Sequence, residues 1–152
     1  ANLGVEWKGI DLSALIQGVG KRNIEIYPYV VVPFVESWRQ PWKINQDYWT
    51  PNNPNALFPR LYLEGTQNTV ASTKWIQNAA YIRLKNLQIG YTLPQRMTKI
   101  VKIQKARVYF TGQDIWEKTK MWYKYFDAEN PNNAAYNYPF FRSYAIGLNV
   151  TF

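Results

Sequence analysis

The chain has 152 residues and a formal net charge of +8, from 18 Lys and Arg against 10 Asp and Glu, and it is long enough for one domain with its own core. It contains no His and no Cys. These absences exclude Ser-His and Cys-His nucleophile pairs, disulfide frameworks and the common zinc sites.

Aromatic residues make up 17% of the chain, a content typical of membrane-interface belts, carbohydrate-binding platforms and nucleic-acid stacking sites. Lys and Arg are scattered rather than clustered, so we expect no nucleic-acid partner. No apolar run is long enough for a transmembrane helix. The amino terminus lacks the basic and apolar segments of a secretory signal, so we expect an exported protein with this sequence to carry its signal elsewhere.

Two alternating segments open the chain, at residues 2–7 and 10–19. Apolar side chains alternate with polar or small ones in both, as in strands with one apolar face. Lys8 and Gly9 separate the segments, and a two-residue connection of this kind predicts a hairpin. Leu15 interrupts the polar face of the second strand.

The alternation is lost over residues 23–73, where prolines recur. Such a composition disfavours long regular elements, although short helical turns at residues 34–38 and 43–48 are expected. A loop of this length is unusual inside a compact soluble domain. It is typical of the extracellular side of outer-membrane barrels.

Strand character returns over residues 75–93. Ile82 and Leu84 share one face, but the apolar face further along is that of Leu87 and Ile89, so the phase slips by one near residues 85–86. Such a slip predicts a β-bulge. Pro94 ends the strand, and residues 95–102 form a short connection.

A fourth strand is predicted at residues 104–117 and a second loop at residues 121–138. Asp114 falls on the apolar phase of this strand. A bulge at Gly112, or a strand end near the membrane surface, is therefore needed to keep its charge out of lipid.

The last strand, at residues 140–152, alternates Tyr144, Ile146 and Leu148 with small or polar residues. This pattern fits a strand with lipid on one side and a polar lumen on the other. Gly147, Val150 and Phe152 have a spacing that resembles the carboxy-terminal signal read by the barrel-assembly machinery of the outer membrane, with Ala145 as a departure. The sequence thus predicts an all-β fold of five antiparallel strands, with short turns at one end and long extracellular loops at the other.

Four segments, in this order and spacing, resemble the carboxy-terminal region of SusC/RagA-type TonB-dependent outer-membrane transporters of Bacteroidetes. They are residues 48–60 (YWTPNNPNALFPR), 81–94 (YIRLKNLQIGYTLP), 106–114 (ARVYFTGQD) and 138–152 (YPFFRSYAIGLNVTF). Ala128 and the Phe140-Phe141 pair depart from the family pattern and bear on loop shape. The resemblance implies a plugged barrel of about 22 strands, of which this chain supplies the last five.

Since five strands cannot close a barrel, we expect the chain to be a fragment, with the plug, the amino-terminal barrel and the TonB-contacting segment outside it. The resemblance further implies active import of an oligosaccharide or peptide across the outer membrane, together with a SusD-like surface lipoprotein and the TonB complex. The strands would contact outer-membrane lipid and lipopolysaccharide. No cofactor and no metal are expected.

The aromatic residues of the long loops are candidates for contact with ligand or lipoprotein, and packing of the loops on themselves is the alternative. These candidates are Trp42, Tyr48, Trp49, Tyr123 and Tyr125. We expect a second set to face the lumen, where contact with the plug and plain solvation are both open: Arg83, Lys85, Arg107 and Gln113. Rings at strand ends, Trp7, Trp75, Tyr91, Trp116 and Phe152, are expected at the membrane interface.

Asp127 and Glu129 are closely spaced acids, but in an Asn-rich loop they indicate turn chemistry rather than a glycosidase pair. We therefore predict no enzyme. The alternative function is a soluble secreted β-rich module that binds carbohydrate through exposed Trp and Tyr. The residues leave the cargo and the oligomeric state open.

Overall fold

The computed structural model describes residues 1–38, 40–123, 126–129 and 141–152. The chain divides into two compact units. We call Ala1–Arg22, Ala80–Lys120 and Pro139–Phe152 the sheet unit, and Asn23–Ala79 and Met121–Tyr138 the loop unit.

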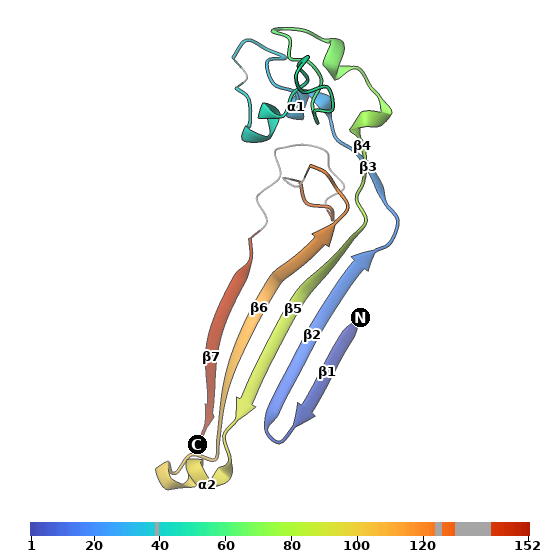
Figure 1. Ribbon diagram of the computed structural model, residues 1–152. Helices are drawn as coiled ribbons and strands as arrows, with labels where there is room; N and C mark the ends of the chain where they lie inside the picture. Colours follow the sequence, from blue (N-terminus) through green and yellow to red (C-terminus); the bar gives the residue numbers. More distant parts are fainter. Residues whose placement is uncertain (39, 124–125, 130–140) are drawn as a thin grey trace. The chain divides into compact units, whose positions relative to one another are not determined.

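The sheet unit is one antiparallel sheet in the order β1-β2-β5-β6-β7 (Figure 1). Its strands are β1 (Asn2–Trp7), β2 (Ile10–Val19), β5 (Tyr81–Thr92), β6 (Lys105–Thr119) and β7 (Ser143–Thr151). The predicted antiparallel arrangement is confirmed. Within the described residues, β1 and β7 each pair with a neighbour on one side only, so both present an edge.

Both short connections lie at the same end of the sheet (Figure 1). Lys8 and Gly9 join β1 to β2 with φ angles of 47° and 86°, the left-handed pair that a tight hairpin turn requires. Between β5 and β6 lie α2 (Gln95–Thr98) and η4 (Lys99–Val101), and Lys102 ends this helical segment at a φ of 57°. The connections that follow β2 and β6 lead into the loop unit.

The predicted bulge in the third strand is confirmed. Leu15 lies opposite Asn86 and Ile16 opposite Leu84, so Lys85 is an extra residue against β2. The register to β6 breaks at the same residue. The bulge places Ile82 and Leu84 on the same face as Ile89 despite the odd spacing between them.

Of the two arrangements expected around Asp114, a bulge at Gly112 or a strand end near the membrane surface, the bulge at Gly112 is not found. Gly112 stays in register with Leu87 and Tyr144, and the break follows Gln113. Asp114 itself adopts a φ of 52°, a left-handed conformation that Asp tolerates better than most residues. This conformation takes its side chain out of the strand alternation.

The loop unit contains a second, two-stranded sheet of β3 (Asn23–Glu25) and β4 (Ile76–Asn78). The strand expected over residues 75–93 is therefore two strands. Trp75 ends η3 (Thr73–Trp75) and is buried, so its expected place at a membrane interface is wrong. Its carbonyl accepts a hydrogen bond from the Ile26 backbone N–H, which ties it to the start of the loop.

Three more short helices lie in the loop unit: α1 (Pro28–Val31), η1 (Lys43–Gln46) and η2 (Gln67–Thr69). The helical turn expected at residues 43–48 corresponds to η1. The one expected at residues 34–38 is absent from the described residues there, and α1 precedes it, with Pro28 at a first-turn position that needs no backbone N–H.

Two buried amides organise this unit. The Asn45 amide donates to the Val31 carbonyl at 2.9 Å and accepts from the Trp42 backbone N–H at 2.7 Å. The Gln77 side-chain oxygen accepts from the Tyr123 backbone N–H at 3.2 Å. Because Gln77 and Tyr123 come from the two separate long loops, these loops share one core. Among the described residues, none of the helices has the length and apolar content to cross a bilayer.

Candidate functional site

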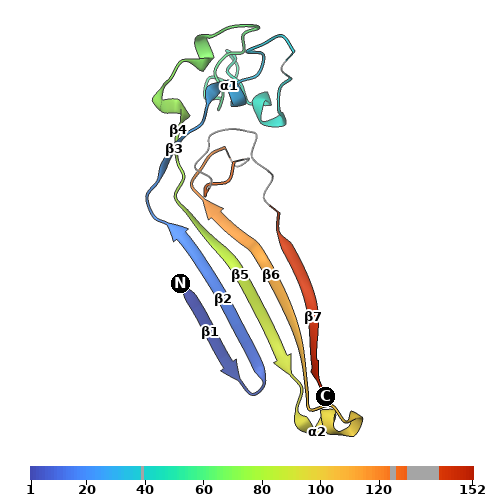
Figure 2. The ribbon, with the colours of Figure 1, turned by 180° about the vertical axis from the view of Figure 1, so that it is seen from behind.

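The register of the five-stranded sheet assigns each paired residue to one of two faces, and the sheet is seen from opposite sides in Figures 1 and 2. Paired residues share a face. One row across the five strands consists of Val5, Leu12, Ile89, Phe110 and Ile146. The next row towards the short turns consists of Trp7, Ile10, Tyr91, Val108 and Leu148. This apolar face is exposed, with Ile146 at 81% and Leu148 at 62%.

The opposite face is polar or small. One row consists of Gly4, Ser13, Gln88, Thr111 and Ala145, and its neighbour of Glu6, Asp11, Gly90, Tyr109 and Gly147. We call this surface the polar face. It carries paired charges that join strands far apart in the sequence.

Asp11 and Arg107 form an ion pair that crosses β5. Arg107 Nε donates to Asp11 Oδ1 at 2.8 Å, and its Nη2 bonds Asp11 Oδ2. Gly90 lies between them, and a Cβ there would overlap the guanidinium and the carboxylate. The glycine is therefore what lets the pair lie flat on the sheet. Sequence reasoning missed Asp11 and Gly90, although an isolated glycine in a strand signals close approach.

The Arg107 guanidinium also lies 5.0 Å from the centre of the Tyr109 ring, a cation–π distance. The Tyr109 ring in turn covers Gly147 on β7, where a Cβ would overlap it. Asp11, Arg107 and Tyr109 thus form a continuous strip of side chains from β2 to β7.

Val150 lies on the apolar face opposite Ala106, and Phe152 is exposed beyond the strand end. The assembly-signal role of Gly147, Val150 and Phe152 stays a prediction.

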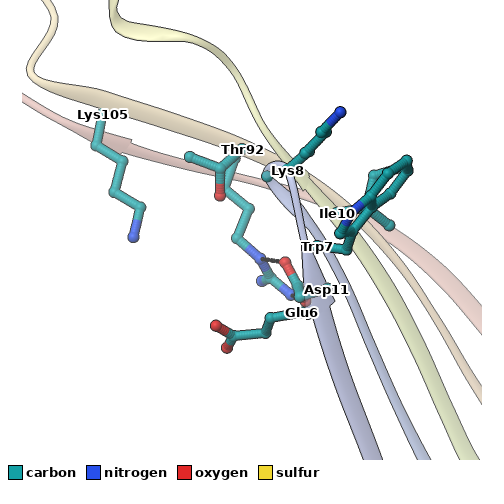
Figure 3. A pocket seen from close by; sticks show the side chains of 9 residues that line it. Glu6, Trp7, Lys8, Ile10, Asp11, Thr92 and Lys105 are labelled. Atoms are coloured by element: carbon teal, nitrogen blue, oxygen red, sulfur yellow. Dashed lines mark hydrogen bonds and ion pairs between the residues drawn. The ribbon is translucent and has the colours of Figure 1, made fainter.

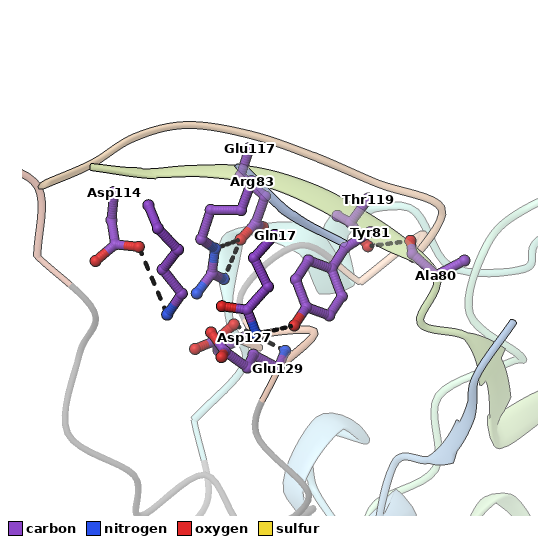
Figure 4. A network of polar contacts seen from close by, with 10 residues as sticks. Gln17, Ala80, Tyr81, Arg83, Asp114, Glu117, Thr119, Asp127 and Glu129 are labelled. Atoms are coloured by element: carbon purple, nitrogen blue, oxygen red, sulfur yellow. Dashed lines mark hydrogen bonds and ion pairs between the residues drawn. The ribbon is translucent and has the colours of Figure 1, made fainter. Parts of the chain in front are cut away.

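A second polar group lies nearer the long-loop end of the polar face (Figure 4). Arg83 is 1% exposed and pairs with Glu117, its direct neighbour across the strands, with Nε to Oε2 at 2.6 Å. The Gln17 amide donates to the Tyr81 hydroxyl at 3.2 Å. The Arg83 guanidinium lies 5.5 Å from the centre of the Tyr81 ring.

Asp114 lies on the same side as Arg83 and Glu117 in Figure 4, and it forms an ion pair at 3.7 Å with Lys85, the extra residue of β5. Gln113 lies in the row of Asn86 and Ser143 on the polar face. The structure therefore brings Arg83, Lys85, Arg107 and Gln113 to one face. Their contact with a plug stays a prediction.

A hollow of about 570 Å³ lies at the short-turn end of the polar face and is lined by Glu6, Asp11, Thr92, Lys105 and Arg107 together with the hairpin turn. Figure 3 shows Glu6, Asp11, Thr92 and Lys105 on one side of the sheet, with Trp7 and Ile10 on the other. The hollow is polar and offers hydrogen-bonding groups, but within the described residues its charges include no cluster suited to a metal ion.

In the loop unit, Trp42, Tyr48 and Trp49 are exposed or nearly so. Tyr48 and Trp49 lie on a turn held by the Asp47 carboxylate, which accepts from the Asn53 amide at 3.0 Å and from the Leu57 backbone N–H at 3.2 Å. The Trp49 backbone N–H donates to the Phe58 carbonyl at 2.9 Å. The Tyr48 and Trp49 rings therefore lie on a turn that hydrogen bonds hold in place. The contact role of Trp42, Tyr48 and Trp49 stays a prediction.

Tyr123 is 2% exposed and packs on Trp122 and Phe126, with ring centres at 5.7 and 5.0 Å. Trp122 in turn meets Phe58 edge-on at 5.8 Å. Tyr123 is thus buried among rings of the loop unit, and its contact role stays a prediction. Tyr125 lies outside the described residues. The Asp127 carboxylate accepts the backbone N–H of Glu129 at 2.9 Å, which is turn chemistry, as expected.

No family model matches the chain. Comparison with individual known proteins finds similar receptors by sequence and by structure. TonB-dependent receptor P26 of Formosa agariphila is 31% identical over 120 residues, which are 70% of this chain and 12% of that receptor. TonB-dependent receptor P3 of the same organism is 32% identical over 117 residues, 68% of this chain and 11% of that receptor. The chain thus spans about an eighth of the length of the curated relatives it matches.

Solved structures agree with the sequence relatives. A structure of the RagAB peptide transporter matches 99% of this chain with a TM-score of 0.72 and 28% identity, over 17% of the matched chain. The RagAB peptide importer in its closed-closed state matches 99% of this chain with a TM-score of 0.73 and 27% identity, over 16% of the matched chain.

Proposed function

The chain belongs to the TonB-dependent receptors related to RagA, of which it matches a segment, and from this we propose that its five strands form part of the wall of a transmembrane barrel. The barrel has about 22 strands and a plugged lumen. The whole receptor imports a nutrient across the outer membrane, with energy supplied through TonB. Receptors of this family are transporters and not enzymes.

One observation carries the proposal: the apolar face of the sheet is exposed along all five strands. Soluble monomers rarely expose a contiguous apolar surface of this extent. Lipid would cover it, and the rings of Trp7, Tyr91 and Phe152 at the short-turn end would lie at the membrane interface. A soluble carbohydrate-binding module would leave this face in water, so the alternative function is disfavoured.

The composition of the polar face supports its assignment to the lumen side of the barrel wall. Several of its charges are paired within the sheet, as in Asp11 with Arg107 and Arg83 with Glu117. Such a surface tolerates water without binding one solute tightly, which suits a path that cargo passes along. In our proposal the plug covers this face at rest, and a pull from the periplasmic side exposes it.

The cargo is an oligosaccharide or a peptide, and a SusD-like lipoprotein closes over the external side. The similarity to the RagAB peptide transporter favours the peptide class. In the loop unit, Trp42, Tyr48 and Trp49 offer rings to the cargo or to the lipoprotein. Stacking on such rings suits both cargo classes.

The test uses the whole receptor that contains this segment, expressed in its native outer membrane. We expect it to migrate as a compact species on gels until heated, and we expect labelled oligopeptide uptake that disappears without TonB. Uptake of labelled oligosaccharide instead would correct the cargo class. A receptor found only in soluble fractions would refute the proposal.

A further inference from the structure

The connection between β5 and β6 is an exposed helical segment with a mixed apolar and basic surface. We call α2, η4 and Lys102 the basic connector. Met97 is 58% exposed and Ile100 is 83% exposed. They are three residues apart, so they lie on the same side of the helical segment.

The basic connector is held in place by backbone and packing contacts. Thr98 is buried, and its carbonyl accepts the Ile103 backbone N–H at 3.0 Å. The Met97 backbone N–H donates to the Pro94 carbonyl at 2.9 Å, and Leu93 bonds to Ala106 at 2.9 Å. The exposure of Met97 and Ile100 is therefore a property of a fixed surface.

Positive charge collects around these two apolar side chains. Arg96, Lys99 and Lys102 belong to the basic connector, and Lys8 and Lys105 lie at the same end of the sheet. In the described part of the sheet unit, the acids at this end are Glu6 and Asp11, and Asp11 is paired with Arg107. No ion pair neutralises Arg96, Lys99 or Lys102 within the described chain.

The basic connector lies at the short-turn end of the sheet, where the apolar face ends (Figure 1). Trp7 and Tyr91 share the row of that face nearest the short turns, and Phe152 follows the end of β7. The Lys8 amine lies 4.9 Å from the centre of the Trp7 ring, which combines an interfacial ring with a cation. If the apolar face is in lipid, the basic connector lies at the height of the headgroups.

We infer that the basic connector is a docking surface for anionic phospholipid at the periplasmic side of the membrane. Met97 and Ile100 insert among the upper parts of the acyl chains, while Arg96, Lys99 and Lys102 bind headgroup phosphates. Basic amphipathic segments bind anionic membrane surfaces in this way. The inference rests on the proposed function, because it requires the apolar face to be in lipid.

The test uses the whole receptor in vesicles of phosphatidylcholine with about a third phosphatidylglycerol, and in vesicles of phosphatidylcholine alone. This segment contains no Cys, so Ile100→Cys, in a receptor whose other cysteines are replaced, carries a single fluorophore. Quenching by lipids with a spin label near the headgroup reports its depth. We expect several-fold stronger quenching in the anionic vesicles.

Charge-reversal variants distinguish an effect of the basic connector from an effect of the receptor's net charge. R96E/K99E/K102E should reduce quenching at position 100 several-fold. K21E/K43E/K74E changes the same number of exposed cations elsewhere and should leave quenching unchanged. Equal quenching with and without phosphatidylglycerol, or an unaffected triple variant, would overturn the inference.

A second label distinguishes a failure of this inference from a failure of the proposed function. A fluorophore at Ile146→Cys, on the apolar face, is quenched by lipids labelled deep in the acyl chain if the proposed barrel wall is right. Quenching there with none at position 100 rejects only the basic connector. Absence of quenching at both positions rejects the proposed function as well.

Discussion

At the scale of single residues, two glycines determine how the polar face is covered. Gly90 leaves room for the Asp11–Arg107 pair, and Gly147 leaves room for the Tyr109 ring. Neither glycine has a left-handed backbone, so each is explained by the side chain that lies over it rather than by its own conformation. Removing that side chain should therefore remove the need for the glycine.

The Gly147 contact gives a double-mutant prediction. Gly147→Ala should destabilise the assembled receptor by about 1–3 kcal/mol, because the Tyr109 ring must move. The same substitution in a Tyr109→Ala background should have much less effect. The measurement is the temperature at which half of the purified receptor loses its compact gel mobility. Equal shifts in both backgrounds would contradict the packing of Tyr109 on Gly147.

The buried Arg83 gives a second prediction at this scale. Glu117→Ala should destabilise the receptor by about 2 kcal/mol, because it removes a partner of a buried guanidinium. Glu6→Ala removes the same charge from an exposed site on the same face and should be near neutral. The same gel assay compares them. Similar losses of stability in the two variants would show that the Arg83–Glu117 pair stabilises the receptor no more than the exposed Glu6 does.

At the scale of elements, the bulge at Lys85 decides which residues of β5 lie on the apolar face. It keeps Ile82, Leu84 and Ile89 on the apolar face and turns Arg83 to the polar face. A strand without the extra residue would turn every side chain on one side of position 85 to the wrong face. The bulge thus keeps the apolar residues before and after it on one face of β5.

Deletion of Lys85 should therefore prevent assembly, because Arg83 or the residues after the bulge would be turned the wrong way. A charged side chain facing mid-membrane lipid costs roughly 2–4 kcal/mol. Lys85→Ala keeps the residue count and should assemble normally apart from the lost pair with Asp114. The readout is the fraction of heat-modifiable receptor in outer membranes. Normal assembly of the deletion variant would refute this role of the bulge.

Alternation in the sequence was sufficient to predict the hairpin and the bulge, because both follow from which side chains must share a face. It failed at residues 76–78, whose alternation continues that of β5 although they pair with β3. The loop core could not be foreseen, because Gln77 meets Tyr123 and Phe58 meets Trp122 across a long sequence separation without any periodic signal. The Asp11–Arg107 pair also joins residues far apart in the sequence, and only the isolated Gly90 signalled it.

At the scale of the whole molecule, the sheet has two open edges and an exposed apolar face. In lipid, unpaired backbone groups at both edges would be costly, and further strands of the receptor would satisfy them. The short turns at one end and the loop unit's connections at the other match the periplasmic and extracellular sides of the proposed barrel. In our proposal the chain forms a sector of the barrel wall.

In the proposed barrel, one face of these strands meets lipid and the other meets the lumen. Spin labels placed one at a time along β7, from Ser143 to Thr151, in the whole receptor in bilayers, test it most directly. Collisions with oxygen, which concentrates in lipid, should peak at positions 144, 146, 148 and 150, and collisions with a water-soluble nickel complex at 143, 145, 149 and 151. Uniform access of the nickel complex along the strand would contradict the account.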